Sequence, residues 1–143
     1  MIDDVTLTPL NVIPTPGGDV LHALKNNDVG FINFGEAYFS EIEYNKIKAW
    51  KRHTKMTMNL VVPIGKINVV LCDDRLDQNE IKFHEVVMSR DNYMRLTIPP
   101  MIWVGFQGLN KVSSLLLNIA DIPHDPEEVD NKEVNQFKYI WSK

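Results

Sequence analysis

The sequence predicts a single all-β domain, on three observations. Short segments rich in β-branched and aromatic side chains recur along the chain, and turn-forming residues separate them. No segment repeats apolar residues at the spacing of a long helix. The 143 residues suit one domain that needs no disulfides to form a core. Together these features are typical of a β-sandwich or barrel.

Proline and glycine mark the start of the chain. Pro9, Pro14, Pro16 and the Gly17-Gly18 pair predict an extended arm over residues 1–29, with one short helical turn over residues 19–25. A loop is expected over residues 73–79, and Pro99-Pro100 forces an extended turn. The barrel spans residues 30–122, and its strands are expected at residues 31–34, 37–43, 47–55, 56–63, 66–72, 81–88, 93–98, 101–106 and 112–120.

The tail over residues 123–143 predicts a short C-terminal helix. Pro126 stands at a first helical position, and acidic residues follow it in the first turn. Further along, the tail carries apolar side chains that can dock against the barrel: Phe137, Tyr139, Ile140 and Trp141. A partly disordered tail is the alternative.

Charge and cysteine content exclude some classes of function. A net charge of −4 and a pI near 5.5 disfavour a general nucleic-acid binder. The single cysteine, Cys72, excludes an internal disulfide and an all-cysteine zinc site, and we interpret it as the end of a buried strand rather than a reactive thiol. No signal peptide and no apolar run of membrane-spanning length is present, so we expect a cytoplasmic protein without membrane contact.

The segment from Lys48 to Lys55 is rich in basic side chains. Strand alternation places its residues on two faces: Lys51, His53 and Lys55 on one, and Lys48, Trp50 and Arg52 on the other. Two interpretations stay open, a solvent-exposed strand and a cationic pocket that attracts anions such as phosphates. A single bulge would change which side chains share a face.

Two other features also have two interpretations each. Trp50 is able to stack on a base or sugar, or to pack in the core. Trp103 and Phe106 follow a barrel corner formed by Pro99-Pro100, and we interpret both as core residues, with Trp103 also a candidate substrate contact. His124 next to Asp125 is either an imidazole oriented for base work or a surface group in a turn.

An ordered set of short pieces resembles the dTDP-4-dehydrorhamnose 3,5-epimerase family over about residues 30 to 130. The pieces are Gly35-Glu36-Ala37-Tyr38-Phe39, Lys48-Ala49-Trp50-Lys51-Arg52-His53, Lys55-Met56-Thr57, Asp73-Asp74-Arg75, Asp91-Asn92-Tyr93, Ile98-Pro99-Pro100, Gly105-Phe106 and His124-Asp125-Pro126. The resemblance implies a cupin-type jelly-roll β-barrel, a homodimer formed through the N-terminal arm, and proton abstraction beside a ketone without metal or cofactor.

The chain departs from the family pattern at the catalytic positions. The resemblance places Lys48 at a substrate-binding arginine and Lys51 at the histidine base, while the acid tyrosine falls near Leu115 to Leu117, where no ionisable group stands. The chain also stops short of the region where larger members carry the acid that pairs with the histidine. The metal pattern of other cupins fails too, since a lysine ammonium is not a useful ligand.

These observations define the candidate site and function. Lys51 and His53 are the candidate catalytic residues, and an acid would come from Tyr38, Tyr93 or His53. The candidate substrate contacts are Lys48, Lys55, Glu36, Tyr38, Asn59 and Trp103. The expected function is epimerisation or ketoisomerisation of a dTDP-4-keto-6-deoxyhexose in deoxysugar and polysaccharide biosynthesis. The alternative is a non-catalytic cupin module that binds a nucleotide-sugar or another small anion.

Overall fold

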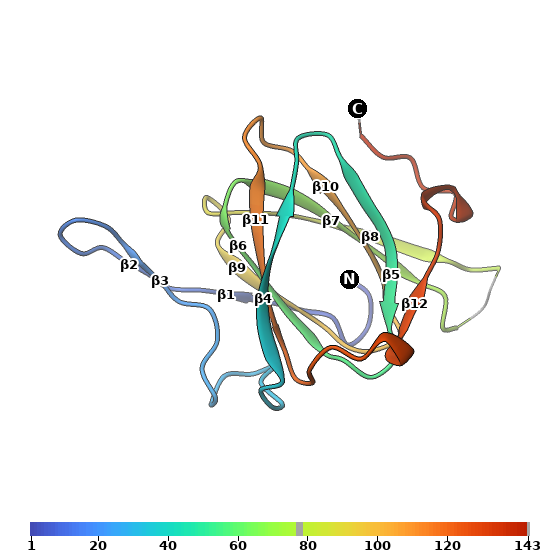
Figure 1. Cartoon of the computed structure of the whole chain (residues 1–143), viewed down its shortest axis with the longest axis horizontal. Coiled ribbons are helices and arrows are strands. Elements are labelled where there is room, and N and C mark those ends of the chain that lie inside the picture. The colour runs from blue at the N-terminus through green and yellow to red at the C-terminus, as the bar shows by residue number, and fades with distance from the viewer. Residues whose placement is uncertain (77–78, 143) are drawn as a thin grey trace.

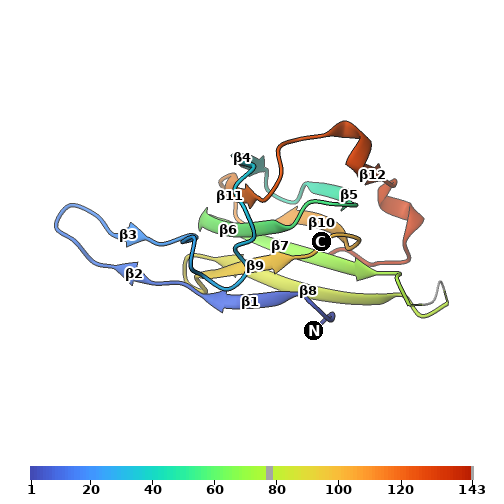
Figure 2. The ribbon, with the colours of Figure 1, turned by 90° about the horizontal axis from the view of Figure 1, so that it is seen from below.

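Two five-stranded antiparallel sheets face each other in the computed structural model, which describes residues 1–76 and 79–142 (Figures 1 and 2). The first sheet contains, in spatial order, β1 (Thr6–Pro9), β9 (Met94–Ile98), β6 (Met58–Ile64), β11 (Ser114–Ala120) and β4 (Glu36–Ile42). The second contains β12 (Val129–Asn131), β5 (Ile47–His53), β10 (Trp103–Gly108), β7 (Lys66–Asp73) and β8 (Lys82–Ser89). The predicted all-β class is confirmed.

The main core lies between the two sheets. Strand alternation turns apolar side chains inward from both, as with Leu60 of β6, Val69 of β7 and Leu96 of β9, all buried. β7 is buried on both faces, because its unbroken apolar run also supplies Val70 and Cys72 to the opposite side. Burial raises the pKa of the Cys72 thiol to about 12, with the Asp74 charge adding to the effect, so this cysteine is the buried strand end that the sequence predicts.

The C-terminal tail covers the outer face of the second sheet. Its aromatic rings join Trp50, Trp103 and Phe83 in a cluster, here called the outer aromatic cluster. Phe137 meets Trp50 edge-on at 5.3 Å between ring centroids, and Tyr139 meets Trp141 at 4.8 Å. The expected docking is confirmed for Phe137, Tyr139 and Trp141, whereas Ile140 is exposed.

The predicted C-terminal helix is wrong. Two 3-10 turns replace it in the described part of the tail, η1 (Pro126–Glu128) and η2 (Val134–Gln136), and no α-helix forms there. Asp125 caps η1 and Pro126 opens it as expected, yet the turn ends after three residues. The chain then pairs with the free edge of β5, because this edge offers β12 backbone hydrogen bonds and apolar burial that an isolated short helix lacks.

The arm also differs from expectation. Residues 19–25 form no helical turn, since β3 (Val20–Leu21) pairs there with β2 (Val12–Ile13) in a hairpin that projects from the sheets (Figure 1). Residues 31–34 form no strand. The loop predicted over residues 73–79 includes Asp77 and Gln78, which lie outside the described residues, as does Lys143 at the end of the predicted tail.

Side chains of the first sheet explain why the chain around residue 30 is irregular. Arg95 is fully buried and donates to the carbonyl oxygens of Ala23 at 2.9 Å and Val29 at 2.6 Å. Asn59 donates to the Gly30 carbonyl at 3.1 Å. These side chains give the carbonyl groups of the segment the hydrogen bonds that a neighbouring strand would otherwise supply. Gly30 has a φ of 94° and lies so close to Thr97 that a Cβ would come within 2.8 Å of its hydroxyl.

Candidate functional site

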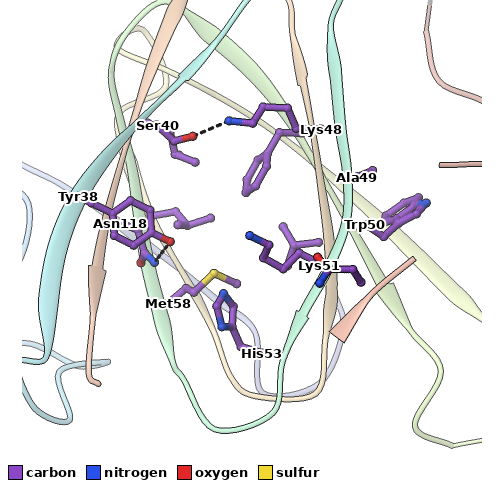
Figure 3. A pocket seen from close by; sticks show the side chains of 14 residues that line it. Tyr38, Ser40, Lys48, Ala49, Trp50, Lys51, His53, Met58 and Asn118 are labelled. Carbon is purple, nitrogen blue, oxygen red and sulfur yellow. Dashed lines mark hydrogen bonds between the residues drawn. The ribbon is translucent and has the colours of Figure 1, made fainter. Parts of the chain in front are cut away.

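A cavity of about 260 Å³ opens between the two sheets, on the side where β4 and β5 lie (Figure 3). Apolar side chains of the core form its floor, among them Met58, Leu60 and Leu116. Its walls carry polar side chains from both sheets: Tyr38, Ser40, Lys48, Lys51, His53, Asn118 and Asn131. This combination of an apolar floor and a few convergent polar groups is typical of small-molecule sites.

A bulge in β5 brings Lys48 and Lys51 to the same wall. β10 pairs Val104 with Lys51 and Phe106 with Lys48, so the two β5 residues between them face the single Gly105. The peptide bond between those two residues, Ala49 and Trp50, is cis. Because the bulge adds one residue, side chains three apart point the same way.

The bulge therefore corrects the expected faces of this strand. Lys48 joins Lys51 and His53 in the cavity, while Trp50 turns outward to the outer aromatic cluster (Figure 3). Arg52 also lies on the outer side, where it donates to Asp130 through Nε at 3.0 Å and Nη2 at 2.7 Å. The cationic-pocket interpretation of this segment thus fits the geometry.

His53, in the cavity wall, forms a buried pair with Glu128 of the tail. The imidazole Nδ1 lies in a short contact with Glu128 Oε1, and both residues are almost fully buried. Glu128 Oε2 accepts from the backbone N–H groups of Lys55 at 3.1 Å and Met56 at 3.2 Å. The Glu128 carbonyl also accepts from the Thr54 N–H at 2.8 Å, which locks the tail against the end of β5.

The charge state of Glu128 determines which ring nitrogen of His53 carries the proton. Burial by itself raises the pKa of Glu128, but hydrogen bonds from His53 and from the two backbone N–H groups hold it below its usual value. The carboxylate is therefore ionised near neutral pH and accepts the proton on Nδ1. This fixes the tautomer and leaves the Nε2 lone pair of a neutral His53 for a ligand.

Tyr38 stands on the opposite wall of the cavity (Figure 3). Its phenolic oxygen accepts from Asn118 Nδ2 at 3.0 Å, and these two residues are direct partners in the β4–β11 pairing. A proton donor from the first sheet thus faces an imidazole from the second. A molecule held between them can exchange protons on two different sides.

The two lysines of the cavity have no acidic partner in the part of the chain that the structure describes. Lys48 Nζ donates to Ser40 Oγ at 2.8 Å and lies 3.4 Å from the Glu41 carbonyl oxygen. Among the described residues, neither Lys48 nor Lys51 forms an ion pair with a carboxylate, although seven other basic residues or imidazoles do: Lys25, Arg52, His53, Arg75, Arg90, Arg95 and Lys132. Unpaired ammonium groups beside a cavity favour an anionic ligand.

The remaining sequence candidates lie elsewhere. β5 ends at His53, so Lys55 leaves the strand and its side chain is exposed outside the cavity rather than on the face with Lys51. Asn59 holds the arm from the outer side of the first sheet, and Glu36 begins β4 without lining the cavity. Trp103 packs in the outer aromatic cluster and donates from Nε1 to Asp74 at 3.0 Å.

Two further groups named in the sequence also lie outside the cavity. His124 is exposed, in agreement with its interpretation as a surface group in a turn. Tyr93 donates to the His22 carbonyl at 2.7 Å, on the side of the arm, and is no source of protons for the cavity.

Sequence reasoning missed Glu128, Ser40, Asn118 and Asn131. The acid of the larger family members is expected to lie beyond this chain, yet Glu128 of the tail gives His53 an acidic partner. It stands next to Glu127 in what reads as an exposed first helical turn, and its partner is 75 positions away. The one available signal was that a buried imidazole needs a partner, which directs attention to every acid of the tail.

Two further findings apply to residues 1–76 and 79–142. Within these ranges no group of three or more histidine, cysteine, aspartate or glutamate side chains is arranged to hold a metal ion. Across the same residues, no helix has the length and apolar character needed to cross a membrane.

Comparison with known proteins identifies the family. No family model matches the chain. A dTDP sugar isomerase from Desulfovibrio desulfuricans, known as a crystal structure, is 40% identical, with 94% of this chain and 87% of that chain covered and a TM-score of 0.89. The chain belongs to the dTDP-4-dehydrorhamnose 3,5-epimerase-like family. The Bacillus subtilis spore coat polysaccharide biosynthesis protein SpsL is also similar to this chain, at 27% identity over 94% of this chain and 89% of its own length.

Solved structures at lower identity share the fold. A dTDP-6-deoxy-D-glucose-3,5-epimerase from Legionella pneumophila is 16% identical, with 94% of this chain and 75% of that chain covered and a TM-score of 0.80. A sugar 3,4-ketoisomerase from Thermoanaerobacterium thermosaccharolyticum is 19% identical, with 92% and 90% covered and a TM-score of 0.73. At these identities the comparison establishes the fold of the epimerase-like family alone.

Proposed function

We propose that this epimerase-like protein is an isomerase of dTDP-linked 4-keto-6-deoxy sugars, which removes a proton beside the ketone and returns it. The observation that carries the proposal is that His53, oriented by Glu128, faces Tyr38 across one cavity. Beside them lie two ammonium groups that form no ion pair with any described residue. The 40% identical relative described as a dTDP sugar isomerase supports this substrate class.

His53 acts as the general base. Its Nε2 lone pair takes the proton from the sugar carbon next to the ketone, and Glu128 stabilises the imidazolium that results. Lys51 was an equal candidate for this role on sequence alone. We assign the base to His53 because it is buried and oriented by a carboxylate, whereas Lys51 is exposed and no described carboxylate contacts it.

Lys51 stabilises the enolate. Removing the proton places negative charge on the former ketone oxygen, and an ammonium group beside His53 in the same wall is suited to receive it. A positive charge that is already in place when the oxyanion develops needs no metal ion for this purpose.

Tyr38 supplies the replacement proton from its own hydroxyl, and the tyrosinate and the His53 imidazolium return to their starting states by proton exchange with water. Tyr38 approaches from the sheet opposite His53, so a proton removed on one face of the sugar is replaced on the other (Figure 3). Delivery to the same carbon inverts its configuration. Delivery to the former ketone carbon moves the ketone, provided that the neighbouring hydroxyl passes its proton to the enolate oxygen. The proposal thus covers both epimerisation and ketoisomerisation.

The diphosphate lies by Lys48 at the cavity mouth. Lys48 keeps one N–H free beyond its contacts with the Ser40 hydroxyl and the Glu41 carbonyl. The Ser40 hydroxyl accepts from Lys48, so its own proton is available to a phosphate oxygen. The resemblance to SpsL supports a place in polysaccharide biosynthesis for the sugar product.

Deuterium exchange tests the function. The protein is incubated with dTDP-4-keto-6-deoxyglucose in D₂O, and deuterium at C3, C4 and C5 is followed by mass spectrometry and NMR. We expect incorporation that is lost in His53→Ala and kept in His124→Ala, a matched control because His124 is exposed outside the cavity. No incorporation by the unmodified protein, together with measurable binding of the nucleotide-sugar, would refute catalysis and favour the non-catalytic module.

We also propose that the protein is a homodimer built on a cupin-type jelly roll, with the arm at the interface. The β2–β3 hairpin extends away from the sheets, and its Val12, Ile13 and Val20 are exposed (Figure 2). An isolated two-stranded hairpin is marginal in water, so a second copy is a suitable cover. Light scattering should give a dimer mass, reduced to the monomer by Val20→Glu; a monomer at micromolar concentration would contradict this.

A further inference from the structure

We propose that Asn118 is a positioning residue that makes the Tyr38 hydroxyl a proton donor toward the cavity. The inference rests on the proposed function, because it concerns how Tyr38 performs its step. Neither the sequence pattern nor the comparisons assign a role to this asparagine.

Asn118 contacts one side chain of β4 and one of the segment just before β6. It lies on β11, directly opposite Tyr38 of β4, and is 2% exposed. Its Nδ2 donates to the Tyr38 phenolic oxygen at 3.0 Å and lies 3.8 Å from Met56 Sδ. A side chain held this firmly at the wall of the cavity can fix the orientation of its neighbour.

The direction of the amide follows from these partners. Both N–H groups of Nδ2 face acceptors, a phenolic oxygen and a thioether sulfur, and the reversed amide would set its oxygen against the sulfur. In this orientation Asn118 Oδ1 is buried and accepts no hydrogen bond from the described residues. An unpaired buried acceptor is uncommon. Here it follows from the amide orientation that places Nδ2 against the Tyr38 phenolic oxygen.

The hydrogen bond decides where the phenolic proton goes. An amide N–H cannot accept a proton, so the Tyr38 O–H has to point away from Asn118. The cavity is the space that Tyr38 and Asn118 both line, and a ligand there receives the O–H bond. A carboxylate in place of the amide would reverse this, because it would accept the phenolic proton and keep it from the ligand.

The first test needs no substrate. In a ¹⁵N–¹H spectrum, one of the Asn118 side-chain N–H protons should move upfield in Tyr38→Phe, because it loses the phenolic oxygen. Tyr38 is 41% exposed, so this substitution leaves the core intact. An unchanged Asn118 side-chain signal would overturn the inference whether or not the protein is an isomerase.

The second test separates the two proton steps. In Asn118→Asp we expect product formation to fall about 10²-fold or more, while deuterium exchange at the carbon next to His53 stays within a few-fold of the unmodified protein. In a Tyr38→Phe background the same substitution should have no further effect on product formation. Equal loss of both steps, or an undiminished effect in Tyr38→Phe, would show a merely structural role.

The outcomes for the inference and for the function remain separate. If the unmodified protein exchanges no deuterium from dTDP-4-keto-6-deoxyglucose, the proposed function fails. If it exchanges deuterium and forms product, yet Asn118→Asp forms product at the same rate, the function stands and the role of Asn118 is refuted.

Discussion

Replacing Glu128 by alanine should remove the hydrogen bonds that hold the tail to the end of β5. The carboxylate receives hydrogen bonds from His53 Nδ1 and from the backbone N–H groups of Lys55 and Met56. Each buried donor left unpaired costs about 1–3 kcal/mol, partly offset because a buried carboxylate is itself expensive to desolvate. We expect Glu128→Ala to lower the free energy of unfolding by about 3–5 kcal/mol.

Glutamine at the same position should separate stability from chemistry. Its amide oxygen can accept from the two backbone N–H groups, which turns its NH₂ toward His53 Nδ1. Nδ1 then has to accept, so the imidazole proton moves to Nε2 and the free lone pair is lost from the cavity side. We expect Glu128→Gln to cost about 1–2 kcal/mol of stability but to slow deuterium exchange about 10²-fold or more.

The stabilising effect of Glu128 should depend on pH. Its pKa is lower in the folded protein than the usual value of 4.5. Such a carboxyl contributes stability that is fully present above the unfolded-state pKa and is lost as the pH falls through the folded-state pKa. The difference in free energy of unfolding between the unmodified protein and Glu128→Ala should therefore be constant near pH 7 and shrink below about pH 4.5.

Urea unfolding and histidine NMR measure both effects. A loss of about 3–5 kcal/mol shifts the urea midpoint by more than about 1 M. The ¹⁵N shifts of the imidazole should report a proton on Nδ1 of His53 in the unmodified protein and on Nε2 in Glu128→Gln. A midpoint for Glu128→Ala equal to that of the unmodified protein, or a proton on Nε2 of His53 when Glu128 is present, would refute the reasoning.

Three further substitutions test other parts of the structure. Arg95→Met should lower the free energy of unfolding by about 3 kcal/mol and speed hydrogen exchange in residues 22–31. Its control, Arg90→Met at a half-exposed position, should cost less than about 1 kcal/mol. Equal effects would contradict the role of buried Arg95 in holding the arm. Gly105→Ala places a Cβ 2.7 Å from the Trp141 ring and should cost about 1–3 kcal/mol in urea unfolding, less in a Trp141→Ala background. Lys48→Ala should weaken dTDP binding about tenfold or more by calorimetry, and unchanged affinity would place the diphosphate elsewhere.

The strand pattern was accessible from sequence because it depends on local spacing. The apolar run that becomes β7 and the alternation that becomes β11 both translate directly into burial. The helix expected after Pro126 did not form, because the free edge of β5 competes for the same backbone groups. That edge exists only in the folded chain, so no local signal around Pro126 reveals it.

The site was predictable in part for the same reason. Alternation correctly grouped Lys51 with His53 but separated Lys48 from them, since the bulge opposite Gly105 leaves no plain mark in the sequence. The resemblance to the family supplied Lys48 where alternation did not. Glu128 was missed because its partner lies 75 positions away. For Trp103 the interpretation as a packed residue agrees with the structure and the substrate contact does not, because an aromatic residue on a strand fits either face.

A crystal structure of the protein with dTDP-4-keto-6-deoxyglucose bound tests the central claim most directly. The account predicts the sugar in the cavity, with the carbon beside its ketone next to His53 Nε2, the Tyr38 hydroxyl on the other face, and the diphosphate at Lys48. A nucleotide-sugar bound outside this cavity, or a His53 whose Nε2 is turned away from the sugar, would contradict it.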